Sequence, residues 1–267
     1  MTTTAVRLQP SVGELLRHWR ERRRLSQLDL ALRADISARH LSFVETGRST
    51  PSREMVLRLA EQLDVPLRDR NQLLLAGGYA PVYAETPLES PRMEAVRAAV
   101  RQVLAAHEPY PAVVVDRGWN LVEANASVAI FTEGLPPALL ASPTNVLRVS
   151  LHPDGLAERI VNLGEWRAHL LARLRRQVSL TADPQLAALY VELRAYPCDQ
   201  PEPEIDLPGP GDVVVPLRLR AGERELAFFS TVATFGTPLD ITVAELAIEL
   251  FFPANAETAA ELRARAA

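Results

Sequence analysis

Apolar residues recur at helical spacing through the first 80 residues and predict five short helices. The predicted helices are residues 12–24, 27–33, 38–46, 52–63 and 67–76. Ser26 and Ser37 stand directly before the second and third of them, where N-cap residues are expected. Gly47 and the Gly77-Gly78 pair stand where helices end. The pattern therefore predicts a small helical domain.

The second and third predicted helices are separated by a tight turn that contains Asp35. Glycine adopts the left-handed backbone of such turns most easily, and Asp and Asn tolerate it next best. We therefore expect Asp35 to be left-handed. In and just before the third helix, we expect the apolar Ile36, Leu41 and Val44 to face inward. The residues left on the outer face are Ala38, Arg39, Ser42 and Phe43.

A different pattern begins after this domain. Three prolines within residues 79–91 predict a stiff linker, which we place at residues 81–91. Residues 92–106 return to helical spacing. The β-branched residues 113–115, a turn at 116–118 and a second apolar run then predict a hairpin. We expect Asn125 to cap the helix that follows.

Residues 126–197 are predicted to be mainly helical, and residues 164–180 form the longest helix. A proline-rich loop at residues 200–210 precedes three predicted strands. These strands are residues 212–220, 223–232 and 241–251, and a short helix follows from residue 254. The chain thus combines two strands, a mainly helical stretch and three further strands, an order that resembles the layout of a PAS-like antiparallel sheet with a helical insertion.

Charge is distributed unevenly along the 267 residues, whose formal net charge is -4. The first 80 residues hold 13 arginines against 9 acids, and the remainder holds 16 arginines against 24 acids. A basic first domain on an acidic body suits a nucleic-acid-binding protein. The single cysteine, Cys198, allows no internal disulfide and fits a reducing cytoplasm. The apolar stretch 230–252 contains three acids, so we expect no membrane span.

The predicted turn lies within a set of residues at fixed spacing that resembles the Xre/phage-repressor helix-turn-helix family. The matching residues are Gln27, Ala31, Ile36, Ser37, Leu41, Ser42, Glu45, Gly47 and Pro51. Asp35 departs from the glycine usual in that family. The resemblance implies that the third helix enters the major groove of a double-stranded DNA operator, with the protein as a homodimer. It also implies that Arg20 pairs with Glu45, while the run 22–24 is either a solvated helix end or a phosphate contact.

The DNA-binding residues implied by this resemblance are Gln27, Ser37, Ala38, Arg39, His40, Ser42, Phe43 and Arg48. We expect Arg39 to bind guanine and Phe43 to contact a thymine methyl group. We expect Gln27, Ser42 and Arg48 to hold phosphates. The alternative is that Phe43 folds back on the first helix and Arg39 contacts only phosphate.

The later part of the chain resembles a second family. The hairpin leading into Asn125-Ala126 resembles the opening of a PAS domain. The run 230–254, with residues 145–153 and 165–170, resembles the MmyB-like regulator ligand-binding domain, which follows an Xre-type domain in that family. The resemblances imply a mainly α chain with α+β. They give a helix-turn-helix domain at residues 1–80 and a PAS-like, ligand-binding and dimerisation domain at residues 92–267.

The second resemblance also implies a bound apolar ligand similar to a fatty acid. We expect Trp166, Leu170 and Phe228 to line its pocket, and Arg148, His152 and His169 to hold its polar end. The alternative for each residue is an ordinary structural role. The second domain would then serve only for dimerisation or for binding a partner protein.

Catalytic patterns are missing from the sequence. The five histidines are scattered without metal-ligand spacing, and no nucleophile elbow, phosphate loop or dinucleotide-binding motif is present. We therefore expect neither an enzyme, nor a metal, nor a cofactor beyond the apolar ligand. The overall expectation is a cytoplasmic bacterial transcriptional regulator, against the alternative of an enzyme with an added helix-turn-helix.

Overall fold

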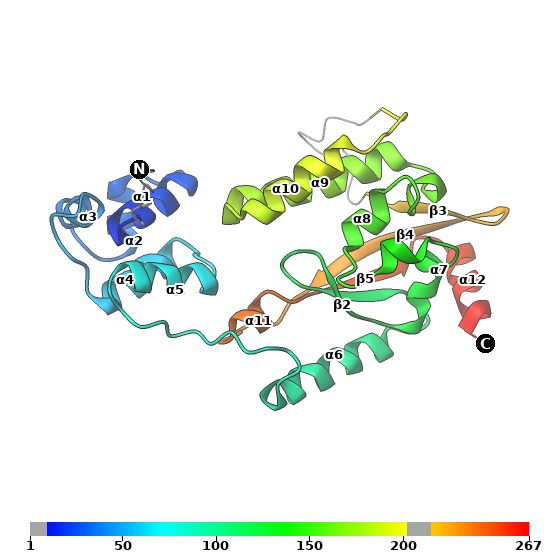
Figure 1. Cartoon of the computed structure of the whole chain (residues 1–267), viewed down its shortest axis with the longest axis horizontal. Helices are drawn as coiled ribbons and strands as arrows, with labels where there is room; N and C mark the ends of the chain where they lie inside the picture. The colour runs from blue at the N-terminus through cyan, green and yellow to red at the C-terminus, as the bar shows by residue number, and fades with distance from the viewer. Residues whose placement is uncertain (1–9, 202–214, 267) are drawn as a thin grey trace, which may run out of the picture. The chain divides into compact units, whose positions relative to one another are not determined.

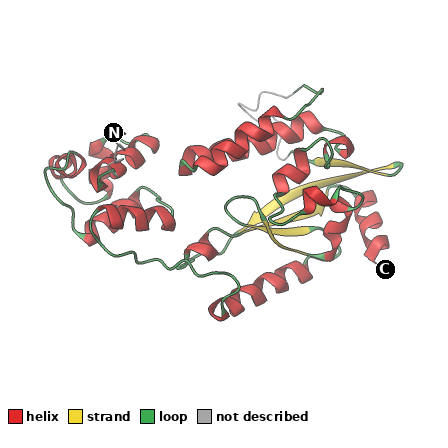
Figure 2. Ribbon diagram, viewed as in Figure 1, coloured by secondary structure: helices red, strands yellow, loops and turns green. Residues whose placement is uncertain are grey.

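The computed structural model describes residues 10–201 and 215–266, and the chain divides into two compact units (Figure 1). The first unit extends to Glu85 and includes Leu239–Ile241, and the second contains the remaining residues. Helices make up most of both units, whereas the strands all belong to the second (Figure 2). The predicted fold class, mainly α with α+β, is confirmed.

Five helices form the first unit, as the apolar spacing predicted. They are α1 (Val12–Arg22), α2 (Gln27–Arg33), α3 (Ala38–Glu45), α4 (Arg53–Gln62) and α5 (Leu67–Ala76). A serine precedes each of the first four, and its hydroxyl accepts a hydrogen bond from the backbone amide three residues on. Fully buried leucines from all five helices form the core, among them Leu16, Leu30, Leu41, Leu59 and Leu73.

The first helix is shorter than its sequence pattern predicted. It ends at Arg22 because Arg24 has a left-handed backbone, with φ of 55°, which turns the chain toward α2. Gly78, with φ of 81°, similarly follows the end of α5. Such a backbone costs a glycine little but strains a residue with a side chain.

A five-stranded antiparallel sheet forms the centre of the second unit, with the order β2-β1-β5-β4-β3. The strands are β1 (Ala112–Val115), β2 (Leu121–Ala124), β3 (Leu217–Ala221), β4 (Arg224–Ala233) and β5 (Ala247–Pro253). The last strand in the sequence therefore lies in the middle of the sheet. Its Glu249 lies opposite Val113 of β1 and Val232 of β4.

Helices cover both faces of this sheet (Figure 1). Ile248 of β5 packs with Val100 and Leu104 of α6 (Glu94–Ala106) on one face. Phe251 belongs to the larger core on the other face, which includes residues of α8 (Val146–Leu151), α9 (Leu163–Thr181) and α10 (Pro184–Ala195). Because side chains alternate along a strand, Glu249 shares the face of Phe251.

Shorter elements connect these layers. The α-helices are α7 (Ala129–Thr132), α11 (Ile241–Ala244) and α12 (Ala256–Ala266). The 3₁₀ helices are η1 (Pro91–Met93), η2 (Ala126–Val128), η3 (Pro137–Leu140) and η4 (Ala157–Arg159). None of the helices in the described ranges is long and apolar enough to cross a lipid bilayer.

Two predictions for the second unit were wrong in detail. The strand predicted at residues 241–251 begins with the helical turn α11, because the Glu245 and Leu246 amides bond to carbonyls three residues back. Asn125 precedes η2 but does not cap it. Its side chain instead bonds to the Ala112 amide at 2.9 Å and the Tyr110 carbonyl at 2.7 Å. Residues 202–214 lie outside the described residues. They include most of the loop predicted at residues 200–210 and the start of the strand predicted at residues 212–220.

Candidate functional site

The α2 and α3 helices are joined by the tight turn that the sequence predicted. Asp35 has φ of 52°, so its left-handed conformation is confirmed. The Ile36 amide bonds to the Ala31 carbonyl at 3.0 Å, which closes the turn. Ser37 then caps α3 through the amide of His40 at 3.1 Å. The direction of α3 is thus set by one backbone hydrogen bond and one side-chain cap within a few residues of the turn.

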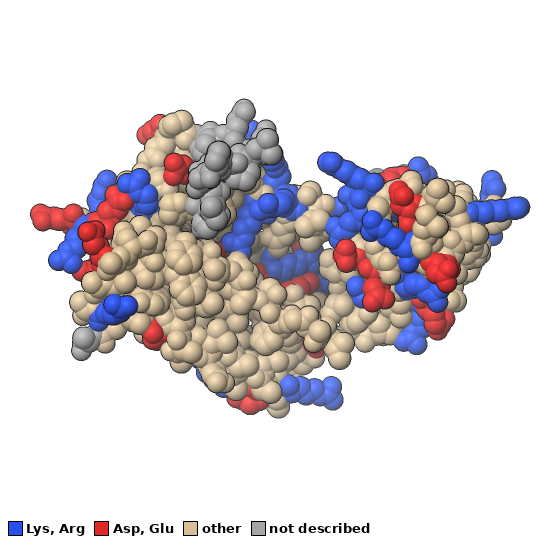
Figure 3. Space-filling model, turned by 180° about the vertical axis from the view of Figure 1, so that it is seen from behind, with Lys and Arg blue, Asp and Glu red and all other residues tan. Residues whose placement is uncertain are grey.

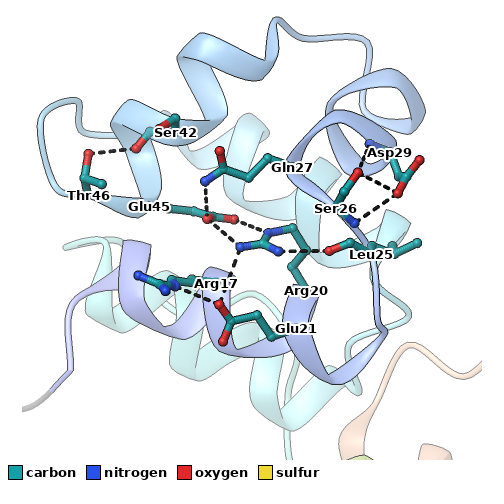
Figure 4. Close-up of polar contacts among 10 residues, drawn as sticks. All are labelled: Arg17, Arg20, Glu21, Leu25, Ser26, Gln27, Asp29, Ser42, Glu45 and Thr46. Carbon is teal, nitrogen blue, oxygen red and sulfur yellow. Dashed lines mark hydrogen bonds and ion pairs between the residues drawn. The ribbon is translucent and has the colours of Figure 1, made fainter.

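A buried ion pair joins three helices beneath this turn (Figure 4). Glu45, only 5% exposed at the end of α3, accepts two hydrogen bonds from Arg20 of α1, at 2.7 and 2.9 Å. Gln27 of α2 donates a third at 2.8 Å, and Arg20 also donates to the Leu25 carbonyl at 2.9 Å. The predicted Arg20–Glu45 pair is confirmed. The hydrogen bond with Glu45 raises the pKa of Arg20.

The outer face of α3 carries an arginine–phenylalanine–arginine stack. Arg39 and Arg48 are exposed, and their guanidinium carbons lie 5.4 and 5.8 Å from the centre of the Phe43 ring. Phe43 is half-buried between them and is not part of the domain core. This placement differs from the alternative in which Phe43 folds back on α1. Stacking holds both guanidinium groups on the outer side of the helix.

The other residues predicted to contact DNA are partly buried or bonded to other parts of the protein. Ala38 packs partly against the core, and His40 and Ser42 are half-buried. The Ser42 carbonyl accepts a bond from the Thr46 hydroxyl at 2.7 Å. The amide of Gln27, predicted to hold phosphate, is bonded to Glu45 instead.

The run of three arginines after α1 serves the fold in part. Arg23 donates hydrogen bonds to the carbonyls of Leu63 and Asp64, both at 2.7 Å. Arg22 and Arg23 also lie over the Trp19 ring, at 5.4 and 5.6 Å. Arg23 therefore holds the end of α4 to α1. Figure 3 shows many arginine side chains at the surface of the first unit.

An apolar cavity of about 210 Å³ lies in the second unit, between the sheet and its helices. Trp166 and Leu170 of α9 line it, together with Phe131, Leu147 and Phe251. Phe228 does not line it: the ring is fully buried in the core, 5.4 Å from the ring of Phe131. The cavity thus lies under the part of α9 where the sequence pattern placed a pocket.

Polar groups in the cavity wall come from residues that the sequence analysis did not select. They are Thr132, Thr144, Ser150 and Glu249. Ser150 accepts a hydrogen bond from the Trp166 indole at 2.9 Å. Glu249, 5% exposed, is ion-paired with Arg173 of α9 at 2.9 Å and accepts a bond from Ser230 at 3.0 Å. The sequence signal that could have identified Glu249 was an acidic residue inside an otherwise apolar predicted strand.

The three predicted polar anchors lie outside the cavity lining. Arg148 makes two hydrogen bonds to Glu192 of α10, at 2.7 and 2.8 Å, which lower the pKa of Glu192. His152 contacts the Tyr196 ring edge-on at 5.2 Å. His169 stacks on Trp166 at 5.6 Å, and its pKa is lowered by burial and then by the charge of Arg173. The structure thus gives each of them a structural partner.

Metal ligands do not gather at either site. Across residues 10–201 and 215–266, no group of three or more His, Cys, Asp or Glu is placed to hold a metal ion.

Comparison with known families agrees with this geometry. Residues 96–264, more than half of the 267, match the MmyB-like transcription regulator ligand binding domain. The chain belongs to the MmyB-like transcription regulators. Residues 16–69 of this regulator match the helix-turn-helix family, so both resemblances are confirmed. No curated protein matches the chain. The regulator therefore carries a DNA-binding helix-turn-helix domain and a ligand-binding MmyB-like domain.

Proposed function

We propose that this regulator binds a double-stranded DNA operator as a homodimer and responds to a small apolar molecule similar to a fatty acid. The observation that supports a ligand of this kind is the apolar cavity of about 210 Å³ inside the MmyB-like domain. An engineered apolar cavity of about 150 Å³ binds benzene, so a space of this size holds a small apolar group. A DNA target places the action of the regulator in the cytoplasm.

Operator binding in this proposal uses the exposed side of α3. Arg39 and Arg48 present cationic groups there, and Phe43 presents an apolar edge between them. An arginine can bind guanine O6 and N7 in the major groove, and an aromatic edge can contact a thymine methyl group. A homodimer would place two such helices on half-sites about one helical turn apart.

Ligand sensing in this proposal is a shift between two arrangements of the MmyB-like domains. A ligand changes such an equilibrium only through a difference in its affinity for the two states. Filling the cavity stabilises the arrangement in which Trp166 and Leu170 line it. The arrangement in turn sets the distance between the two helix-turn-helix domains of a dimer, and so the affinity for the operator.

A second candidate is that the MmyB-like domain serves only for dimerisation or for binding a partner protein. The size of the cavity favours this alternative, because pockets for drug-sized ligands usually measure about 300–1,000 Å³.

A native mass spectrum of the purified full chain, paired with selection from random DNA duplexes, tests the proposal. We expect a dimer, a co-purified apolar small molecule, and enrichment of a two-part duplex sequence whose binding changes when that molecule is removed. A ligand-free protein with unchanged DNA affinity in the presence of apolar compounds would favour the second candidate.

A further inference from the structure

The stretch that follows α5 is fastened to that helix by side chains. Asn71 of α5 accepts hydrogen bonds from the amides of Val82 and Tyr83, at 3.0 and 3.1 Å. It also donates one to the Tyr83 carbonyl at 2.7 Å. Arg68 of the same helix donates two hydrogen bonds to the carboxylate of Glu85, at 2.9 and 2.5 Å. Residues 82–85 are therefore held to α5, although the sequence pattern placed them in the linker.

A segment from much later in the chain pairs with this fastened stretch. The Ile241 amide donates a hydrogen bond to the Ala84 carbonyl at 2.8 Å, and Ala84 forms a parallel bridge with Asp240. Leu239–Ile241 thus belongs to the first compact unit, although in sequence it lies between β4 and β5 of the second. We call residues 82–85 and 239–241 the paired hinge.

The end of the paired hinge at Ile241 leads directly to the cavity. α11 begins at Ile241, and β5 follows it after two residues. β5 supplies Glu249 and Phe251 to the cavity wall. A shift of β5 therefore reaches Ile241 through a single helical turn.

Arg117 ties the end of this turn to the long helix that lines the cavity. Its guanidinium group pairs with Glu245 at 3.4 Å, and its carbonyl accepts a hydrogen bond from Gln177 of α9 at 2.9 Å. The same helix carries the lining residues Trp166 and Leu170. The cavity wall is thus connected to the residues before β5 by β5 itself and by α9 through Arg117.

We propose that the paired hinge carries the signal from the cavity to the helix-turn-helix domain. A ligand that favours one position of β5 favours the made or the broken state of the hydrogen bond between Ile241 and Ala84. Residues 82–85 then transmit that state to α5. One backbone hydrogen bond in water contributes little net free energy, so a ligand can shift its equilibrium. This inference rests on the proposed ligand sensing and assigns it a route.

Amide hydrogen exchange of the full chain tests the hinge without a ligand. In Asn71→Ala, residues 82–85 lose the bonds of the Asn71 side chain. We therefore expect the amide of residue 241 to exchange about tenfold faster or more, because its acceptor is released from α5. Gln72→Ala is the matched control, since Gln72 is exposed on the same helix, and it should leave this exchange unchanged. Unchanged exchange in Asn71→Ala would overturn the hinge.

The route of the signal is tested with decanoate as the probe and a duplex selected from random sequences. We expect decanoate to change the affinity of the unmodified protein for this duplex about fivefold or more. Ile241→Pro removes the amide donor at the first position of α11, where proline is tolerated, and should abolish most of this response. Ile241→Ala is the matched control, because it removes the side chain but keeps the amide, and it should retain the response.

The outcomes separate this inference from the proposed sensing function. Suppose that decanoate slows exchange in β5 but leaves the DNA affinity unchanged, or changes it equally in Ile241→Pro. The hinge route is then wrong, while binding in the cavity stands. If decanoate changes neither exchange in the cavity wall nor DNA affinity, the proposed sensing is wrong and the route falls with it. Asn71→Ala in the same titration gives the decision if Ile241→Pro does not fold.

Discussion

Gly13 and Val44 approach so closely that a Cβ atom on Gly13 would lie 2.2 Å from the Val44 carbonyl oxygen. The α1 and α3 helices therefore pack together at this point without a side chain between them. The Arg20–Glu45 ion pair joins the same two helices farther along. Together the two contacts fix the position of the helix that presents Arg39 and Phe43.

The first prediction concerns this close approach. Gly13→Ala should lower the free energy of unfolding by about 1–3 kcal/mol, because α1 must move away from α3. This loss outweighs the helix propensity that alanine adds, which is about 1 kcal/mol. Urea denaturation measures the change. Arg17→Ala, on the exposed side of α1, is the control and should leave the free energy of unfolding nearly unchanged, because its pair with Glu21 is exposed to solvent.

Removal of the buried carboxylate should also weaken the helix-turn-helix domain. We expect Glu45→Ala to destabilise it by about 1–3 kcal/mol, since Arg20 and Gln27 both lose their acceptor. Glu21→Ala is the control: Glu21 is half exposed and lies 3.7 Å from Arg20. Chemical denaturation of both variants distinguishes the two sites. A neutral Glu45→Ala would show that the ion pair does not stabilise the domain.

The variant Arg39→Ala can show whether Arg39 binds a base or a phosphate. If it binds a guanine, Arg39→Ala costs about 1–3 kcal/mol on the cognate operator and relaxes the preference at one base pair. If it binds phosphate, affinity falls equally on all sequences and the salt slope decreases by about one. Because Phe43 stacks under its guanidinium group, we expect base reading. Titrations of the operator and its single-base variants at two salt concentrations give the answer.

Trp166 should contribute to both stability and ligand binding. Trp166→Ala removes a buried lining side chain, so we expect a stability loss of about 3–5 kcal/mol and weaker binding of the cavity ligand. Leu174→Ala is the matched control, because Leu174 is fully buried on the same helix but does not line the cavity. It should lower stability by about 2–5 kcal/mol while the folded protein keeps its ligand affinity. Equal losses of affinity would place the ligand elsewhere.

Tyr196 makes stability depend on pH in the alkaline range. Burial raises the pKa of its hydroxyl from 10.0 to about 12, helped by the hydrogen bond to Glu192. Because the folded pKa lies above the unfolded one, this contribution is complete below pH 10.0 and is lost as the pH rises toward about 12. Ultraviolet titration of tyrosinate should show a late-ionising group that disappears in Tyr196→Phe. An unchanged titration in that variant would contradict the assignment.

The sequence predicted most accurately those features that depend on neighbouring residues. Serine caps, the left-handed Asp35 and the apolar faces of the first five helices are local, and the structure confirms them. The start of the strand predicted at residues 241–251 was wrong, because the β-branched residues 241–243 also fit a buried helical turn.

The ligand anchors could not be predicted in the same way. Arg148 and Glu192 are 44 positions apart, so only the packing of α8 on α10 shows that they form a pair. The direction of Glu249 depends on the register of β5 against β1 and β4, since a shift by one residue would turn it to the α6 face. The position of α9 was visible in the helical spacing of its apolar residues, and Trp166 and Leu170 do line the cavity.

The place of β5 in the sheet has a consequence for biosynthesis. Because this strand comes last in sequence yet pairs with both β1 and β4, the two halves of the sheet cannot join until residues 247–253 have left the ribosome. The five helices of the first domain make contacts within about 80 residues and can fold much earlier. A chain stalled before β5 should therefore already hold a folded helix-turn-helix domain.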